Sequence, residues 1–226
     1  MMSQAGSTWL VAIGAASTTA VYEPPESGGE CAVFICAHGA GGNIADRGML
    51  AASAAMRGEG IGVVRFNFLY RERKSGRPDP MPRLMETFAA VVERVRSELS
   101  PGRLIIGGRS MGGRAASMLA AEGLDADGLL LLAYPLHPAG KPGKLRDEHL
   151  PQITMPVLCF CGTRDPLCTR ELMERALLTV NAPWEMHWVE GADHGFHVLK
   201  SSGRSDAEVL SGIADVSRRW IAQISA

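Results

Sequence analysis

Short apolar runs alternate with longer amphipathic segments along most of the 226-residue chain. The runs are rich in Val, Ile, Leu and Phe, as in strands buried on both faces of a parallel sheet, and the amphipathic segments fit crossover helices. This alternation predicts an α/β fold with a mostly parallel sheet of about seven to eight strands and helices on both faces. The predicted strands cover residues 9–14, 18–22, 32–37, 62–67, 103–107, 128–133, 157–161 and 184–189.

Two of the amphipathic segments have a clear helical period. Apolar side chains repeat on one helical face over residues 84–99 and again over residues 209–224. Ser205 and Glu208 form a capping-box sequence, which predicts that the second helix begins next to Ser205. No internal repeat or long linker divides the chain, so we expect residues 1–226 to form a single domain. The Pro- and Gly-rich stretches 71–82 and 137–151 are interpreted as functional loops within it.

Charge and cysteine content narrow the possible partners and the compartment. A net charge of -1 gives no electrostatic reason to expect binding to nucleic acid or to an anionic membrane. The apolar run at residues 9–17 is too short to cross a bilayer, and no Lys or Arg precedes Arg47. Five cysteines, an odd number placed mostly in apolar runs, favour reduced buried thiols and a cytoplasmic location. The C-x-C pair is interpreted as packing rather than as a zinc site, so no metal is expected; the cysteines are Cys31, Cys36, Cys159, Cys161 and Cys168.

One serine stands between closely spaced glycines, in "RLIIGGRSMGGRAASMLAAEG". The five residues Gly108 to Gly112 match G-x-S-x-G, a short pattern that carries weight only in the right context. Here an apolar strand precedes the pattern and a helix rich in small residues follows it, as in a nucleophile elbow. The missing Lys after Gly112 argues against a phosphate-binding loop, and Arg109 stands where a dinucleotide-binding loop needs glycine. Ser110 is therefore the predicted nucleophile.

A serine hydroxyl needs a base to take its proton and a carboxylate to orient that base. His194 lies in a glycine-flanked loop after the last predicted strand, and Asp165 lies in a turn after the strand at 157–161. Both positions fall at the carboxyl edge of the sheet, which also carries Ser110, so we predict a Ser110, Asp165, His194 triad. Asp193 is the alternative acid, although a residue adjacent to His194 is badly placed to reach its ring. Three further histidines, His149, His187 and His197, are interpreted as structural or solvated.

An oxyanion hole needs two backbone amides aimed at the developing negative charge. The amide of Met111, directly after the nucleophile, is the first candidate. The loop "HGAGGN" after the strand at 32–37 supplies the second, for which we predict the amide of Ala40. His38 is interpreted as a support of this loop rather than as a chemical participant.

These segments resemble the α/β-hydrolase superfamily over nearly the whole chain. The resemblance is to its small form without a cap, similar to dienelactone-hydrolase-like proteins and small carboxylesterases. The stretches "YPLHPAGKPGKLRDEHLPQI" and "GTRDPL" further resemble a hydrolase-like family that includes a subunit of the NSL histone acetyltransferase complex. Dienelactone hydrolase uses a cysteine nucleophile where this chain has Ser110, so its substrate is not carried over.

The sequence thus predicts a serine hydrolase that cleaves short-chain carboxylic esters or thioesters through an acyl-enzyme, without a cofactor. Only about twenty residues separate the strands at 128–133 and 157–161, too few for a helical lid, so we expect an open site. A peptidase or acyltransferase would use the same groups, and a non-catalytic binding or scaffold protein is the alternative from another class. The basic loops are interpreted either as solvated surface or as a rim that attracts an anionic substrate; they carry Arg71, Arg73, Lys74, Arg77, Arg83, Lys141, Lys144 and Arg146, with Glu72 and Asp79 among them. The oligomeric state and the role of Arg109 stay open.

Overall fold

A computed structural model of the chain describes residues 6–26 and 32–224. Within this part of the chain, eight strands form one sheet in the order β1-β2-β4-β3-β5-β6-β7-β8. Strands β3 to β8 run parallel, whereas β2 pairs antiparallel with both β1 and β4. The strands are β1 Ser7–Ile13, β2 Ala16–Glu23, β3 Ala32–Ala37, β4 Gly62–Phe66, β5 Arg103–Arg109, β6 Gly128–Leu132, β7 Val157–Gly162 and β8 Trp184–Val189.

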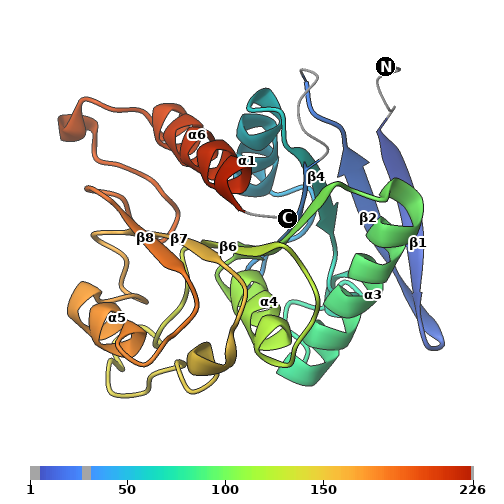
Figure 1. Ribbon diagram of the computed structural model, residues 1–226, viewed down its shortest axis with the longest axis horizontal. Helices are drawn as coiled ribbons and strands as arrows, with labels where there is room; N and C mark the ends of the chain where they lie inside the picture. Colours follow the sequence, from blue (N-terminus) through green and yellow to red (C-terminus); the bar gives the residue numbers. More distant parts are fainter. Residues whose placement is uncertain (1–5, 27–31, 225–226) are drawn as a thin grey trace.

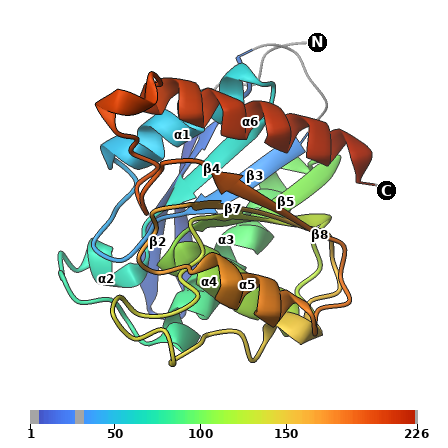
Figure 2. The same cartoon turned by 90° about the vertical axis from the view of Figure 1, so that its left-hand side faces the viewer.

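Helices cover both faces of this sheet. Helices α1 and α6 lie together on one face, and α3, α4 and α5 lie on the other (Figure 1, Figure 2). Each face has its own apolar cluster, so the sheet separates two layers of core. The helices are α1 Arg47–Gly58, α2 Leu69–Glu72, α3 Met81–Leu99, α4 Met111–Ala121, α5 Arg170–Leu177 and α6 Asp206–Gln223, with short 3-10 helices at Leu150–Gln152 and Lys200–Ser202.

The sequence prediction of an α/β fold with a mostly parallel sheet is confirmed, with small changes at the ends of strands. Central strands such as β3, β4 and β7 are buried at every position, which explains their continuous apolar runs. Strand β1 alternates buried and exposed side chains because it lies at the sheet edge. The main difference is β5, which continues two residues beyond the predicted end at 107 to Arg109 and so carries the chain directly to Ser110.

The helix predictions are confirmed as well. The apolar face of residues 84–99 belongs to α3, and Ser205 caps α6 with the predicted capping box. The described residues between β6 and β7 contain the 3-10 helix Leu150–Gln152 and no cap domain, as expected from the short connection. In the described ranges, no helix has both the length and the apolar composition needed to cross a bilayer.

Candidate active site

Ser110 occupies a strained turn between β5 and α4. Its φ of 51° and ψ of -116° are unusual for a residue other than glycine, and its amide donates to the carbonyl of Leu132 at 2.9 Å. The strain persists because glycines let the chain pass close to β3. A Cβ added to Gly112 would lie 2.6 Å from the carbonyl oxygen of Ala37, and one on Gly108 would overlap the same residue. The turn holds the Ser110 side chain at the carboxyl edge of the sheet.

The structure brings Ser110, His194 and Asp165 into one chain of hydrogen bonds. Oγ of Ser110 lies 2.9 Å from Nε2 of His194, and Nδ1 of His194 lies 2.7 Å from Oδ2 of Asp165. A carboxylate only accepts hydrogen bonds, so Nδ1 donates to Asp165 and the Nε2 lone pair of the neutral ring accepts from the Ser110 hydroxyl. The Asp165 side chain is fully buried, and its Oδ1 accepts from the amide of Leu167 at 2.8 Å. Both carboxylate oxygens are therefore fixed.

Asp193, the alternative acid, faces its own loop. Its Oδ1 accepts from the amides of Gly195 at 2.7 Å and of His197 at 3.0 Å. These bonds shape the turn that presents the neighbouring His194. The carboxylate that contacts the His194 ring is that of Asp165.

The two candidate oxyanion donors lie next to the serine. Met111 is the first residue of α4, and the first amides of a helix have no acceptor within that helix. Ala40 belongs to the loop after β3, and this loop touches the elbow, since a Cβ on Gly39 would lie 3.5 Å from Cβ of Ser110. Ala40, Ser110 and Met111 line the same cavity. Both candidate residues therefore lie at the cavity that contains Ser110.

His38 supports that loop through both ring nitrogens. Nε2 accepts from the amide of Phe68 at 3.2 Å, so Nδ1 carries the hydrogen and donates to the carbonyl of Gly39 at 2.8 Å. The Phe68 ring packs edge-on against the imidazole at 5.0 Å between centroids. Burial lowers the pKa of His38, although the bond to Gly39 opposes this shift. The ring is thus held neutral, as its interpretation as a structural support requires.

The other histidines make contacts outside the hydrogen-bonded chain. The ring of His149 contacts the Ser117 hydroxyl at 2.8 Å, whereas His187 and His197 contact nearby carboxylates. His137, to which the sequence assigned no role, contacts the Thr169 hydroxyl at 2.9 Å. These pairings agree with structural or solvated roles.

The cysteines are buried and unpaired wherever the structure describes them. Cys36, Cys159, Cys161 and Cys168 are free thiols, and Cys31 lies outside the described residues. Burial raises the pKa of Cys36 to about 12, which keeps this thiol protonated. In residues 6–26 and 32–224, no group of three or more His, Cys, Asp or Glu side chains is arranged to hold a metal ion.

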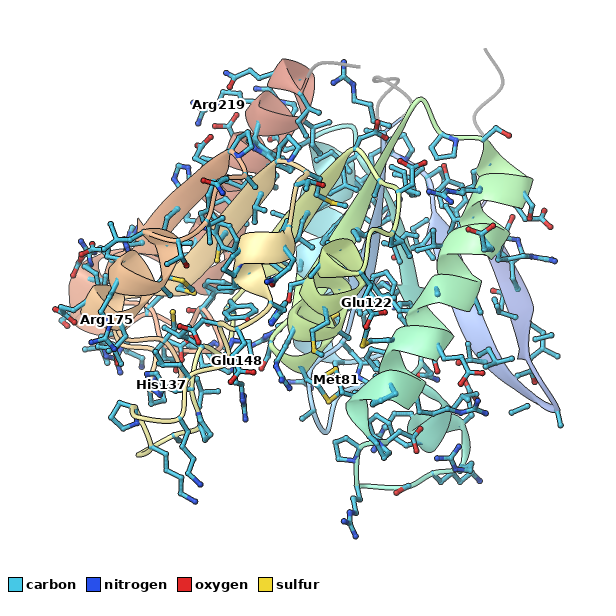
Figure 3. All side chains as sticks on the ribbon, turned by 60° about the horizontal axis from the view of Figure 1, so that its bottom comes forward. Met81, Glu122, His137, Glu148, Arg175 and Arg219 are labelled. Atoms are coloured by element: carbon cyan, nitrogen blue, oxygen red, sulfur yellow. The ribbon has the colours of Figure 1, made fainter. Side chains whose placement is uncertain are left out.

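A cavity of about 420 Å³ opens beside the serine. One end is formed by Ala40, Ser110 and Met111, and much of the remaining wall is apolar. Figure 3 shows Met81 at the start of α3 and His137 on the loop after β6. Met81 lines the cavity, and the loop that carries His137 contributes Pro135 and Pro138 to its wall. Its polar walls are Asp79, Arg114 and Arg146.

Most side chains of the basic loops do not line this cavity. Arg73 pairs with Asp79, and Arg83 pairs with Glu86. Of the basic side chains predicted for a rim, only Arg146 lines the cavity.

The sequence analysis did not identify Arg114, which also lines the cavity. Its position four residues after Ser110, one helical turn further on, is the signal that points to it.

The family model described as an alpha/beta hydrolase domain matches residues 30–222, so this chain belongs to the α/β-hydrolase family. Among solved structures, a serine hydrolase without a lid from Xanthomonas campestris is 22% identical to this chain, with a TM-score of 0.74. The match covers 96% of this chain and 95% of the Xanthomonas chain. Dienelactone hydrolase from Anabaena variabilis is 17% identical with a TM-score of 0.76, and the match covers 98% of this chain and 99% of the hydrolase chain. The esterase domain of a Rhodothermus marinus protein is 17% identical with a TM-score of 0.70, and the match covers 96% of this chain and 99% of the esterase chain.

These matches confirm the resemblance to small lidless α/β-hydrolases that the sequence suggested. At these identities the solved structures establish the fold, and a shared fold alone does not define a substrate. Family membership supports a hydrolase. The bond that is cleaved and the role of each side chain have to be argued from the site.

Proposed function

We propose that this protein is a serine hydrolase that cleaves short-chain carboxylic esters or thioesters through an acyl-enzyme. Ser110 is the nucleophile, His194 the general base and acid, and Asp165 the residue that orients His194. The observation that carries the proposal is the continuous hydrogen-bonded chain, with 2.9 Å between Ser110 and His194 and 2.7 Å between His194 and Asp165. Such distances are those needed for proton transfer from a serine to a histidine.

Each group has a defined task in the reaction. Oγ of Ser110 attacks the carbonyl carbon while Nε2 of His194 takes the hydroxyl proton. The carbonyl oxygen becomes negative and accepts from the amides of Met111 and Ala40. Collapse of this intermediate breaks the bond to the leaving alcohol or thiol, which receives the proton from His194. Water then attacks the acyl-enzyme with His194 again as base, releasing the carboxylic acid and restoring the serine. No cofactor takes part in this sequence.

Short substrates fit this site better than long lipids. The connection between β6 and β7 carries only a 3-10 helix in the described chain, and the cavity beside Ser110 has a volume of about 420 Å³. Long acyl chains are hydrolysed best in deep apolar clefts that cover them. An uncovered cavity supports small acyl and alcohol groups. The four unpaired buried thiols in the described residues support a reducing compartment, and a cytoplasmic location is part of the proposal.

The test is covalent labelling by a fluorophosphonate, together with a panel of short esters, thioesters and amides. We expect the purified wild-type protein to be labelled and to hydrolyse short esters, and Ser110→Ala to lose both properties. Ser97→Ala, which removes an exposed hydroxyl on α3, is the matched control and should behave as wild type. A folded wild-type protein that neither labels nor hydrolyses any member of the panel would contradict the proposal and favour a binding role.

A further inference from the structure

Two arginines face the substrate cavity without a carboxylate partner. Arg114 follows Ser110 by one turn of α4, and Arg146 comes from the loop between β6 and β7. Both line the cavity that contains Ser110 and Met111. In the described part of the chain, neither guanidinium forms an ion pair. Arg73 and Arg83, by contrast, are paired with Asp79 and Glu86.

The hydrogen bonds of the two arginines leave donors unused. Nε of Arg114 is buried and has no hydrogen-bond partner among the described residues. Arg146 donates from Nη1 to the carbonyl of Pro135 at 3.3 Å, and its own carbonyl accepts from the Tyr134 hydroxyl at 2.6 Å. These bonds fix the Arg146 segment beside the cavity while leaving guanidinium donors available. A buried donor without a partner is costly, and an acceptor atom of a bound water, ion or substrate would lower that cost.

The two positive charges are close enough to affect each other. The pKa of Arg146 is lowered by burial and by the positive charge of Arg114. The same two causes, burial and Arg114, lower the pKa of His149 to about 4. Half-buried positive charges that repel one another are stabilised by a nearby anion, and in the described ranges the one carboxylate that lines this cavity, Asp79, forms its ion pair with Arg73 instead.

Asp79 limits the charge that the counterion can carry. It lines the same cavity. One of its oxygens pairs with Arg73, and the other, Oδ2, is buried with no hydrogen-bond partner in the described residues. A dianionic group such as a phosphate monoester would be repelled by this carboxylate. A single carboxylate matches two guanidinium groups, which bind such planar anions through paired N–H donors.

From this arrangement we propose that Arg114 and Arg146 bind a carboxylate on the substrate, so that the preferred esters carry one negative charge near the scissile bond. This inference rests on the proposed hydrolase function and specifies its substrate class. The carboxylate belongs either to the acyl part or to the alcohol part of the ester, and matched substrates distinguish these two sources.

The experiment compares two pairs of substrates that differ only in charge. For the acyl part, the pair is the 4-nitrophenyl monoester of glutaric acid and the same compound with its free carboxylate methylated. For the alcohol part, the pair is 4-acetoxybenzoate and its methyl ester. We expect wild-type kcat/KM to be at least about 10-fold higher for the charged member of one pair, which corresponds to about 1.4 kcal/mol, because charge-assisted hydrogen bonds to a guanidinium stabilise the bound carboxylate.

Variants then locate the effect. Arg114→Gln and Arg146→Gln should each reduce the ratio of charged to neutral kcat/KM by at least about 5-fold, and the double variant should bring it close to one. Arg77→Gln, which removes an exposed charge from the loop after α2, is the matched control and should keep the wild-type ratio. A similar loss in Arg77→Gln would mean general attraction by the basic surface and would overturn the inference.

The wild-type comparison needs no variant, so the inference can fail even if an arginine variant does not fold. A wild-type ratio near one in both pairs overturns it. If the protein is labelled by the fluorophosphonate and cleaves the neutral esters while this ratio is one, only the carboxylate site is wrong. If neither labelling nor hydrolysis occurs, the proposed function itself is wrong.

Discussion

Nη2 of Arg109 donates a hydrogen bond to the backbone carbonyl of His194 at 3.3 Å. Arg109 is the residue before the elbow serine, so this bond joins the nucleophile turn to the loop that carries the candidate base. The side chain passes over Gly48, where an added Cβ would lie only 2.5 Å from Nη1. Arg109 lines a separate cavity of about 190 Å³ with Phe196 and does not line the cavity beside the serine. Its geometry is that of a positioning residue.

Replacing Arg109 should therefore reduce turnover more than substrate binding. We expect Arg109→Met to lower kcat for a neutral 4-nitrophenyl ester by about 10- to 100-fold with little change in KM, because small displacements of reacting groups have effects of this size. Arg109→Lys keeps a donor and should recover part of the loss. Steady-state kinetics on the folded fraction, measured alongside thermal unfolding, checks this. A lower melting temperature with normal kcat would leave Arg109 with only a structural role.

The sheet was predictable because its sequence pattern follows directly from burial. Strands β3, β6 and β7 are buried on both faces, so their apolar runs are unmistakable, and the G-x-S-x-G pattern falls between a strand and a helix. The end of β5 was missed because glycine usually weakens strands. In β5 the neighbouring strands β6 and β3 approach so closely that a side chain would collide with them, which explains why positions 107 and 108 are glycine within a strand.

The parts of the site that follow directly from strand order were predictable from the sequence. The side chains that loops bring to the cavity were not. Ser110, Asp165 and His194 each follow a parallel strand, so topology alone brings them to one edge. Arg114 could have been found from its position one helical turn after Ser110, whereas Asp79 and Arg146 reach the cavity from two different loops that no spacing rule relates. The charge content of the loop at 71–82 was also misleading, because Glu72 turns inward to accept from the amide of Thr19 at 2.9 Å. Only the folded chain reveals which charges remain free.

The choice between the two candidate acids, Asp165 and Asp193, has a direct test. We expect Asp165→Asn to lower kcat by up to about 10,000-fold, because an amide no longer holds the Nδ1–H tautomer of His194. Asp193→Asn keeps an oxygen able to accept from the amides of Gly195 and His197, so its effect on kcat should be far smaller. Ester kinetics with both variants decides the matter. Equal losses in the two variants would contradict the assignment of the acid role to Asp165.

His38 should affect the height of the pH–rate profile and not its shape. Burial lowers the pKa of His38, which favours the neutral ring, and its two ring nitrogens contact the backbone of Phe68 and Gly39 rather than Ser110, His194 or Asp165. His38→Gln disturbs the support of the Ala40 loop, and we expect kcat to fall by about 10- to 100-fold, less than the loss of a whole oxyanion donor. The kcat profile between pH 5 and 9 is the measurement. A titration step that disappears in the variant would instead make His38 a proton carrier.

Gly112 should tolerate no side chain. The added methyl group of Gly112→Ala would lie 2.6 Å from the carbonyl oxygen of Ala37, so α4 or β3 must shift. We expect a loss of about 1–3 kcal/mol in the free energy of unfolding together with a lower kcat. Gly58→Ala, at the end of α1 with no atom within 4 Å of the added methyl group, is the control and should be neutral or stabilising by up to about 1 kcal/mol. Urea unfolding of both variants would reveal the contrast, and equal effects would exclude the close contact as the cause.

The stability of the protein should depend on pH through His149, in a direction that the structure defines. Ser117 already donates its hydroxyl hydrogen to the carbonyl of Arg114, so Nε2 of His149 donates to the Ser117 oxygen. Burial and the charge of Arg114 lower the His149 pKa from its ordinary value of 6.5 to about 4. Between these pH values the unfolded chain binds more protons than the folded one, so stability is present above about pH 6.5 and is lost as the pH falls toward 4.

We therefore expect the free energy of unfolding to fall more steeply between pH 6.5 and 4.5 in the wild type than in His149→Gln, which keeps a donor for Ser117. The difference is at most about 1.4 kcal/mol per pH unit and smaller in practice, because His149 is partly exposed. Arg114→Gln removes the nearby positive charge, so it should raise the His149 pKa and reduce the same slope. Urea titrations at several pH values, with the His149 ring followed by NMR, test both effects. Identical slopes in all three proteins would mean that Arg114 and His149 do not interact, and would also weaken the case for an unpaired charge in the substrate cavity.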